Sequence, residues 1–448
     1  MKRILYNSLL NWKSDPDRKP LILEGARQVG KTWLLTEFGN NEFDNLIYVN
    51  CHDNPSARQL FSQDLKVERI LRDVEAITGL RATAGKSLLF FDEIQEAPHG
   101  LSSLKYFCEQ VRDLHVVVAG SLLGVTHRMG ESYPVGKVDL LRLHPMSFVE
   151  FLWATDKQAL SRLVIDCEWE SLRNLDPMLQ DLLRQYYYVG GMPEAVLSYT
   201  TRHNLERVRT IQHQILSSYI NDMAKHAGEI DDRIRLVWQS IPSQLARENK
   251  KFVYGAVKKG GRARDFETAI QWLVDAGIVH RVHRCKQPDM PLKFYEDFDA
   301  FKLYLLDVGL LGALADVPAS KMLTNNDVFM QFKGAFTENY VLQQLHASGH
   351  LPIYYYSKEN SMVEVDFVVQ TDHRVIPIEV KAEANVKSKS LSQFINIDHA
   401  ALHLIGLRCS MLPYVDQGWM ENIPLYAIEG YIRQQHKSPC YTSPDLTT

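Results

Sequence analysis

The stretch that decides the fold is Leu21-Ile22-Leu23-Glu24-Gly25-Ala26-Arg27-Gln28-Val29-Gly30-Lys31-Thr32, an apolar strand that runs into the pattern GxxxxGKT. This pattern is typical of a loop that wraps the phosphates of a nucleoside triphosphate. Its glycines let the backbone N–H groups point at the β-phosphate, beside the partly positive N-terminus of the following helix. We expect Lys31 to reach the β- and γ-phosphates and Thr32 to ligate Mg²⁺. The predicted nucleotide-binding residues of the loop are Gly25, Ala26, Arg27, Gln28, Val29, Gly30, Lys31 and Thr32.

Two further apolar runs end in polar residues. Ser87-Leu88-Leu89-Phe90-Phe91-Asp92-Glu93 reads as a strand buried on both faces of a parallel sheet. We expect Asp92 to hold Mg²⁺ and Glu93 to polarise the water that attacks the γ-phosphorus, because phosphoryl transfer depends on positioning and charge neutralisation. The run 114–120 is followed by Ser121. Ser121 stands where P-loop ATPases of the AAA type carry the residue that senses the γ-phosphate.

The composition limits the class of protein. A chain of 448 residues is too long for one ordinary core, so we expect two or three domains. The formal net charge of −4 argues against a protein that coats nucleic acid nonspecifically. The six cysteines form no CxxC pair, which indicates reduced thiols. No run of about 18 apolar residues occurs, so we expect a cytoplasmic protein without membrane contact.

The pattern along the chain divides it into four parts. Strand and helix patterns alternate from residue 20 to about 150, which is typical of a parallel sheet covered by helices. We therefore predict an α/β fold with a P-loop core at 1–147 and a helical lid or linker at 148–232. A winged helix at 233–297 and a nuclease-like α/β domain at 298–448 follow.

The winged helix is predicted from three helical patterns and a strand pair. The strands are expected at 277–282 and 293–295, on either side of a Pro-containing turn. Six cations precede or open the third helix: Lys250, Lys251, Lys258, Lys259, Arg262 and Arg264. They could contact phosphates. The third helix also carries Asp265, Glu267 and Asp275, which oppose a phosphate backbone, so DNA binding and packing against protein both remain open.

A second chemical site is predicted near the C-terminus. Asp366 lies in a strand pattern, and thirteen residues later Glu379-Val380-Lys381 alternates so that Glu379 and Lys381 share a face. Glu338 lies in an upstream helical run. This is the constellation of PD-(D/E)xK nucleases, in which Glu338, Asp366 and Glu379 would hold Mg²⁺ and Lys381 would orient the attacking water. Phosphodiester cleavage and a remnant without activity both remain open.

The order of these motifs resembles a large prokaryotic family of P-loop ATPases whose AAA-type core is joined to a nuclease-like C-terminal domain, formerly of unknown function. The segments that carry the resemblance are 25–32, 91–95, 120–121, 188–193, 301–310, 365–366 and 379–381. The resemblance covers nearly the full chain. It implies ATP as the nucleotide, and the absence of the guanine-reading pattern NKxD agrees with this.

One departure from the family concerns the arginine that would sense the γ-phosphate. The family commonly has Gly-Arg after the sensor strand, whereas this chain has Gly136-Lys137. Lysine lacks the bidentate fork of arginine, so Arg128 and Arg142 are the substitutes to consider.

Two functions follow from the sequence. The first is an ATP-hydrolysing enzyme, with catalytic Glu93, that drives a C-terminal nuclease-like module on DNA through Asp366, Glu379 and Lys381. The alternative is an ATP-dependent switch whose C-terminal domains bind a protein partner without cleaving nucleic acid.

Overall fold

The structure, a computed structural model, describes residues 1–121, 123–128, 134–226, 228–323, 330–358, 361, 363–382 and 387–436. Its contacts divide the chain into two compact units, which we describe separately. The N-terminal unit comprises Lys2–His144 with Trp272–Ile278, and the C-terminal unit comprises Met1, Pro145–Gln271 and Val279–Thr448. Within the described part of the chain, every helix is too short or too polar to span a lipid bilayer.

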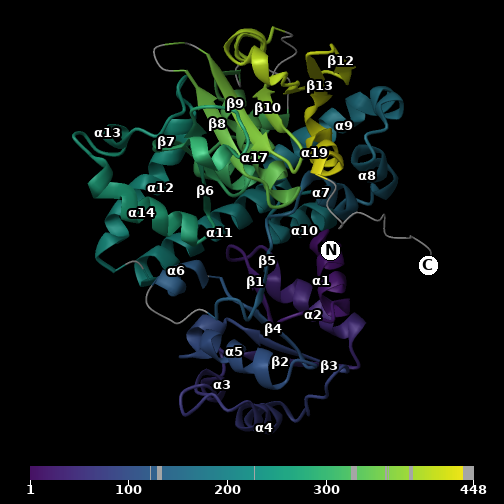
Figure 1. Ribbon diagram of the computed structural model, residues 1–448, viewed down its shortest axis with the longest axis vertical. Helices are drawn as coiled ribbons and strands as arrows, with labels where there is room; N and C mark the ends of the chain where they lie inside the picture. Colours follow the sequence, from purple (N-terminus) through teal and green to yellow (C-terminus); the bar gives the residue numbers. More distant parts are fainter. Residues whose placement is uncertain are drawn as a thin grey trace. The chain divides into compact units, whose positions relative to one another are not determined.

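The N-terminal unit is built on a five-stranded sheet in the order β2-β3-β4-β1-β5, in which all strand pairs are parallel (Figure 1). This confirms the predicted parallel α/β sheet. Its elements are α1 (Leu5–Ser14), β1 (Leu21–Glu24), α2 (Lys31–Glu42), β2 (Asn45–Asn50), α3 (Pro55–Arg58), α4 (Val67–Thr78), β3 (Ser87–Asp92), α5 (Gly100–Gln110), β4 (His115–Ala119), α6 (Leu123–Arg128) and β5 (Asp139–Arg142).

The register of this sheet brings the polar strand ends together. β3 and β4 are buried throughout, as expected for strands covered on both faces. Asp92 pairs with Ala119, and Leu23 pairs with the same residue from the other side. The loops that follow β1, β3 and β4 therefore begin side by side at one edge of the sheet, where ligands bind in open parallel sheets.

The C-terminal unit combines helices with a mixed sheet. Its helices are α7 (Phe148–Ala154), α8 (Gln158–Ile165), α9 (Trp169–Val189), α10 (Pro193–Arg202), α11 (Leu205–His226), α12 (Asp231–Leu245), α13 (Tyr254–Val257), α14 (Ala263–Asp275, the end of which is counted with the N-terminal unit), α15 (Val308–Leu314), α16 (Ala319–Leu323), α17 (Met330–Ala347), α18 (Lys389–Gln393) and α19 (Ile428–His436). The helical region expected at 148–232 thus exists, and its contacts group it with this unit.

The sheet of this unit has eight strands in the order β12-β13-β11-β10-β9-β8-β6-β7. The strands are β6 (Val279–Cys285), β7 (Glu296–Leu305), β8 (Ile353–Ser357), β9 (Glu364–Gln370), β10 (Val375–Val380), β11 (Gly406–Ser410), β12 (Val415–Asp416) and β13 (Met420–Pro424). β6 pairs antiparallel with β7 and also joins β8, so the expected wing is part of the larger sheet.

One predicted strand is wrong. Residues 293–295 lie in a 3₁₀ turn, Leu292–Tyr295, and the partner of β6 starts only at Glu296. The Leu292 N–H donates to the side chain of Gln370 at 2.8 Å, and the first backbone hydrogen bond to β6 is accepted by Tyr295 from Lys286, at the end of the turn. The second strand of the hairpin is therefore shifted toward the C-terminus.

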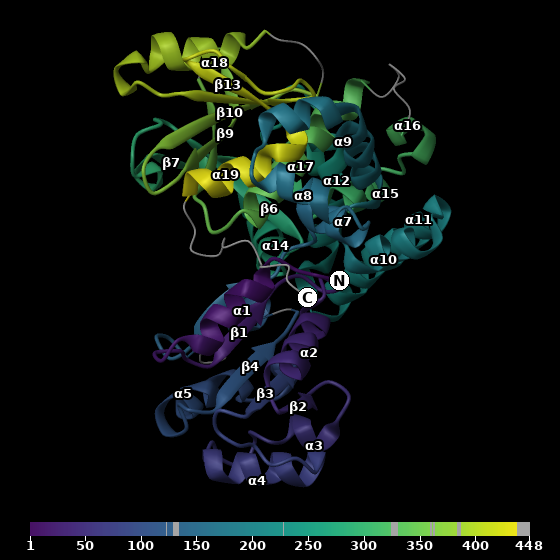
Figure 2. The ribbon, with the colours of Figure 1, turned by 90° about the vertical axis from the view of Figure 1, so that its right-hand side faces the viewer.

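Two helices pack on the mixed sheet. α17 contacts β7 and β10, and α18 contacts β9 and β10 (Figure 2). Val365 packs in the apolar cluster that contains Leu391 and Phe394. Asp366, the next residue along β9, lies instead near Glu338 of α17, whose charge acts on its carboxyl group. Glu379 of β10 shares a face with Val375, a member of the same apolar cluster as Val365, and so lies on the α18 side.

Candidate functional site

The phosphate-binding loop has the backbone that its sequence predicts. It joins β1 to α2, which begins at Lys31 with Gly30 as its N-cap at φ 96°. Gly25 has φ 149°, and a Cβ atom placed there would lie 2.3 Å from the carbonyl oxygen of Leu143. Only glycine fits this position. The loop therefore curls between the end of β1 and the helix N-terminus, as phosphate binding requires.

Lys31 lies inside this loop. Its Nζ atom donates hydrogen bonds to the carbonyl oxygens of Gly25, at 2.8 Å, and of Ala26, at 2.9 Å. Burial lowers the pKa of Lys31 to about 8, although Glu93 and Asp92 work to raise it. The ammonium group is thus held by carbonyl dipoles that a phosphate could replace.

Thr32 and Asp92 meet as predicted. The Thr32 hydroxyl donates a 2.8 Å hydrogen bond to Asp92 Oδ2, and the Tyr48 hydroxyl donates to the same oxygen at 3.1 Å. Burial raises the pKa of Asp92. The hydroxyl and carboxylate oxygens are hard ligands brought to one point, so this pair fits a Mg²⁺ ion. Tyr48 was not foreseen, because its contact with Asp92 depends on β2 lying beside β3 in the folded sheet.

Glu93 and Ser121 also come together. Glu93 Oε2 accepts hydrogen bonds from the Ser121 hydroxyl at 3.1 Å and from its backbone N–H at 3.3 Å. The side-chain amide of Gln95 donates to the same carboxylate oxygen. Glu93 itself has φ 50°, an uncommon conformation for a residue with a side chain. The structure thus links the predicted catalytic acid to the predicted sensor, and it adds Gln95, to which the sequence assigned no role.

The cations that could stand in for an arginine at the γ-phosphate differ in their positions and ion-pair partners. Lys137 forms an ion pair of 2.8 Å with Glu109 of α5. Arg142 ends β5 and pairs with Glu24 at 2.9 Å, directly before Gly25. The side chain of Arg128 lies outside the described residues. Of the two described candidates, Arg142 is the one adjacent to the phosphate loop.

The C-terminal polar site occupies neighbouring strands. Asp366 Oδ2 accepts a 2.8 Å hydrogen bond from the backbone N–H of Val380, and Glu379 pairs in register with Arg408 on β11. Lys381 Nζ lies 3.0 Å from Glu379 Oε1. The other carboxylate oxygen of Glu379 is buried and has no hydrogen-bond partner among the described residues. Glu379 and Lys381 are therefore neighbours, but the charges that act on Asp366 are those of Glu338, Lys302 and Lys250. Glu379 shares a face of β10 with Val375, which packs toward α18, so it lies on the other side of the sheet from Glu338.

Glu338 reaches Asp366 from α17, and both of its oxygens already accept a hydrogen bond. Its carboxylate accepts hydrogen bonds from Lys250 and, at 3.0 Å, from the Tyr304 hydroxyl. Lys302 Nζ lies 4.0 Å from it and forms a close ion pair with Glu364. Lys250, Lys302 and Tyr304 are site residues that the sequence did not reveal.

Burial and the neighbouring charges shift the pKa values of Asp366 and Lys302. Burial, reinforced by the charge of Glu338, raises the pKa of Asp366 to about 7, while Lys302 and Lys250 oppose the shift. Burial works to lower the pKa of Lys302, yet Glu338, Glu364 and Asp366 together raise it above the ordinary value. The site therefore carries resident ammonium groups among its carboxylates.

Mg²⁺ does not fit this arrangement. Among the described residues, no group of three or more His, Cys, Asp or Glu side chains is placed to hold a metal ion. Mg²⁺ requires near-octahedral oxygen ligands, whereas the oxygens of Glu338 are taken by lysine and tyrosine donors. That Glu338, Asp366 and Glu379 share a metal ion stays a prediction, and it requires these donors to move and Glu379 to reach the side of the sheet that faces α17.

Two segments that supported the family resemblance meet in one buried junction. Asp307, at the N-cap of α15, accepts hydrogen bonds from the backbone N–H of Gly191 at 2.6 Å and of Leu310 at 2.9 Å. The side-chain amide of Gln343 on α17 donates to the same carboxylate at 3.0 Å. A Cβ atom on Gly191 would lie 2.1 Å from the carbonyl oxygen of Met146. The residues of both segments are therefore explained by how they pack in this junction.

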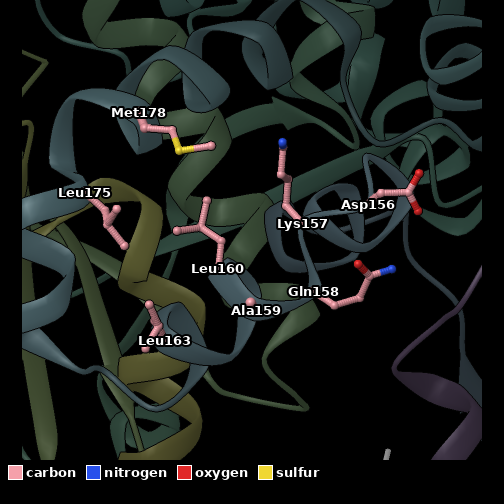
Figure 3. Close-up of a pocket in the computed structure, with 8 residues that line it drawn as sticks. All are labelled: Asp156, Lys157, Gln158, Ala159, Leu160, Leu163, Leu175 and Met178. Carbon is pink, nitrogen blue, oxygen red and sulfur yellow. The ribbon is translucent and has the colours of Figure 1, made fainter. Parts of the chain in front are cut away.

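A shallow groove of about 380 Å³ lies between α8 and α9 (Figure 3). Its lining is mainly apolar and consists of Asp156, Lys157, Gln158, Ala159, Leu160, Leu163, Leu175 and Met178. None of the predicted site residues lines it. The groove is therefore part of neither the nucleotide site nor the C-terminal polar site.

Comparison with known families agrees with the order of these parts. Residues 17–152 match an AAA domain, residues 180–321 match the domain of unknown function DUF8612, and residues 333–428 match the domain of unknown function DUF4143. The chain thus carries an AAA domain followed by two domains of unknown function, and the AAA match implies ATP as a ligand. No curated protein sequence matches the chain.

Solved structures show only distant similarity. A Walker-type ATPase of Pyrococcus abyssi aligns over 70% of this chain and 95% of that chain, at 14% identity and a TM-score of 0.42. The Orc1 protein of Aeropyrum pernix, solved in complex with DNA, aligns over 71% and 92% at 14% identity and a TM-score of 0.28. Similarities this distant carry no conclusion about function.

Proposed function

We propose that this protein binds ATP with Mg²⁺, hydrolyses it, and uses the nucleotide state as a switch for its C-terminal unit. The main support for the proposal is that two pairs of residues are in contact at the carboxyl edge of the parallel sheet. Thr32 contacts Asp92, and Ser121 contacts Glu93. All four residues belong to the part of the chain that matches an AAA domain.

The residues have separable roles. The loop 25–30 wraps the phosphates with its backbone N–H groups, and Lys31 exchanges its carbonyl partners for phosphate oxygens. Thr32 and Asp92 would hold Mg²⁺, which when bound neutralises charge on the phosphates. Glu93 orients the attacking water and accepts its proton. Ser121 holds the Glu93 carboxylate at the strand end beside this water.

Binding measurements with two variants test the nucleotide site. Titration calorimetry should show ATP binding to the wild type and none to Lys31→Ala, which lacks the phosphate-binding cation. Asp92→Asn should bind ATP with its dependence on Mg²⁺ weakened. Unchanged ATP affinity in Lys31→Ala would contradict the assignment of the loop.

Nucleic-acid binding is a second candidate function. Two of the acids that would repel a phosphate backbone have hydrogen-bond partners within the structure. Glu267 is bound by Arg281, at 2.6 and 2.7 Å, and by the Tyr254 hydroxyl. Asp265 accepts the backbone N–H of Arg262 at 2.9 Å and so acts as a local cap. These acids are thus engaged and leave the neighbouring cations available.

The cations in question form an exposed basic loop, which consists of Lys258, Lys259, Arg262 and Arg264. In the described part of the chain, Lys258, Lys259 and Arg262 form no salt bridge, and Arg264 lies 3.9 Å from Asp265. Such a concentration of exposed positive charge suits a phosphodiester backbone. We propose DNA as the partner of this loop, and a protein partner remains the alternative.

Metal-dependent cleavage by the C-terminal polar site is not part of the proposal. Its carboxylates are matched by Lys250, Lys302 and Lys381. Incubation of the purified protein with single- and double-stranded DNA and Mg²⁺ should therefore leave the DNA intact. Cleavage that disappears in both Asp366→Ala and Lys381→Ala would restore the nuclease hypothesis.

A further inference from the structure

The most unusual side chain outside the nucleotide site is that of Lys302. It lies on β7, at the edge of the eight-stranded sheet, yet it is 0% exposed. Its ammonium group contacts Glu364, lies 4.0 Å from Glu338, and sits 4.8 Å from the centre of the Tyr355 ring. A lysine is retained at such depth only when carboxylates compensate for the lost hydration.

The partners of Lys302 form a defined group, which we call the acid cluster: Glu338, Glu364 and Asp366. Lys250 approaches the cluster from the loop before α13 and bonds Glu338, with 15% of its side chain exposed. Glu379 lies outside the cluster and has its own cations, Lys381 and Arg408. Every acid of the cluster except Asp366 thus has a cation beside it.

We propose that Lys302 and Lys250 are the built-in counter-ions of the acid cluster, so that the cluster is assembled by ammonium groups and takes no divalent cation. The inference goes beyond the proposed ATPase function and does not depend on it. It assigns positioning roles to two residues outside the D…ExK pattern.

The geometry of the donors supports this assignment. Glu338 accepts Lys250 and Tyr304, Glu364 accepts Lys302, and one oxygen of Asp366 accepts the Val380 N–H. Mg²⁺ is bound in proteins through one or two carboxylates, with water completing its octahedron, so an ion in the cluster would have to displace these donors. A divalent ion in the cluster would also be repelled by the ammonium groups of Lys302 and Lys250. These groups could move into water only by breaking their ion pairs with the acids.

The inference predicts how the cluster responds when a counter-ion is removed. Lys302→Met keeps much of the length of the side chain but leaves Glu338 and Glu364 without the ammonium group. A divalent cation then has carboxylates to neutralise. The variant should therefore melt at a lower temperature than the wild type and regain stability when Mn²⁺ is added, whereas the wild type should not respond to Mn²⁺.

The experiment is thermal unfolding of the nucleotide-free full-length protein with and without millimolar MnCl₂. Mn²⁺ should change the wild-type melting temperature by less than about 1 °C and raise that of Lys302→Met by about 3 °C or more. Lys293→Met is the matched control, because Lys293 is an exposed lysine whose carboxylate partner, Glu296, lies outside the cluster. It should show neither effect.

Each alternative outcome has a clear meaning. Nucleotide-free wild type that is stabilised by Mn²⁺, with the effect lost in Asp366→Asn, would overturn the proposal and establish a metal site. Full stability of Lys302→Met without a response to Mn²⁺ would also overturn it. If Lys302→Met does not fold, Lys250→Met at the rim of the cluster decides, and it should show the same gain of a response to Mn²⁺.

Discussion

The carboxylate of Glu93 is held by Ser121 through both the hydroxyl and the backbone N–H, at 3.1 and 3.3 Å. Ser121 follows β4 and Glu93 follows β3, and these strands are neighbours in the parallel sheet. The proposed catalytic acid is therefore oriented by the next strand. This relationship makes the role of Ser121 testable apart from nucleotide binding.

Ser121→Ala should lower kcat for ATP about tenfold and leave the ATP affinity nearly unchanged, because a positioning hydrogen bond is removed while the phosphate loop stays intact. Steady-state kinetics and calorimetry separate the two quantities. Ser62→Ala, at an exposed position in the same unit, is the control and should retain wild-type kinetics. An equal loss of affinity and kcat in Ser121→Ala would instead indicate damage to the whole site.

ATP affinity should fall at alkaline pH because of Lys31. Burial lowers the pKa of this lysine in the free protein to about 8, so the side chain is charged below that pH and neutral above it. Only the charged form attracts phosphate. The Kd for ATP should therefore increase about tenfold between pH 7 and pH 9. Lys31→Arg stays charged over this range, and any affinity that it retains should not depend on pH.

The basic loop should determine DNA binding if DNA is the partner. Replacing Lys258, Lys259, Arg262 and Arg264 by serine should abolish binding in fluorescence anisotropy. Partial replacement should reduce the dependence of log K on log salt by about 0.9 for each phosphate that the loop no longer neutralises. The control replaces four exposed cations of the N-terminal unit, Lys66, Arg72, Arg81 and Lys86, and should bind like the wild type. Equal weakening in both variants would mean that only net charge matters.

The buried junction at Asp307 should be a major source of stability in the C-terminal unit. Asp307→Ala leaves the N–H groups of Gly191 and Leu310 and the amide of Gln343 without this acceptor. Because each unpaired buried donor costs about 1 kcal/mol or more, the free energy of unfolding should fall by about 3 kcal/mol. Chemical denaturation measures this change. Asp289→Ala, at an exposed turn, should change it by less than about 0.5 kcal/mol.

The nucleotide site could be predicted from sequence because its geometry is local or follows from the sheet. Gly25 to Thr32 form one continuous stretch, a loop and the start of α2, and the register of parallel strands brings Asp92 and Ser121 close to it. Tyr48 and Gln95 were not assigned because nothing in their neighbouring residues marks which side chain reaches the site. They became visible only when the strands and turns were in place.

Less of the C-terminal unit could be predicted, because some of its contacts form only in the tertiary fold. Asp366, Glu379 and Lys381 lie on or directly after adjacent strands of one sheet, but their spacing does not reveal that Asp366 faces Glu338 while Glu379 faces Arg408. Lys302 meets its partner Glu364 only through the tertiary fold. Its signal in the sequence is a single lysine inside the apolar run of β7, which can also be read as the solvated side of an edge strand. The expected strand at 293–295 is a 3₁₀ turn, and its first N–H is bound by Gln370, which is distant in sequence.

The measurement that tests the central claim most directly is ATP hydrolysis by the purified protein with Mg²⁺, compared between the wild type and Glu93→Gln. The wild type should turn over ATP, and Glu93→Gln should bind ATP normally while its turnover falls by about 100-fold or more. Wild-type turnover in Glu93→Gln, or no turnover in a wild type that binds ATP, would contradict the account.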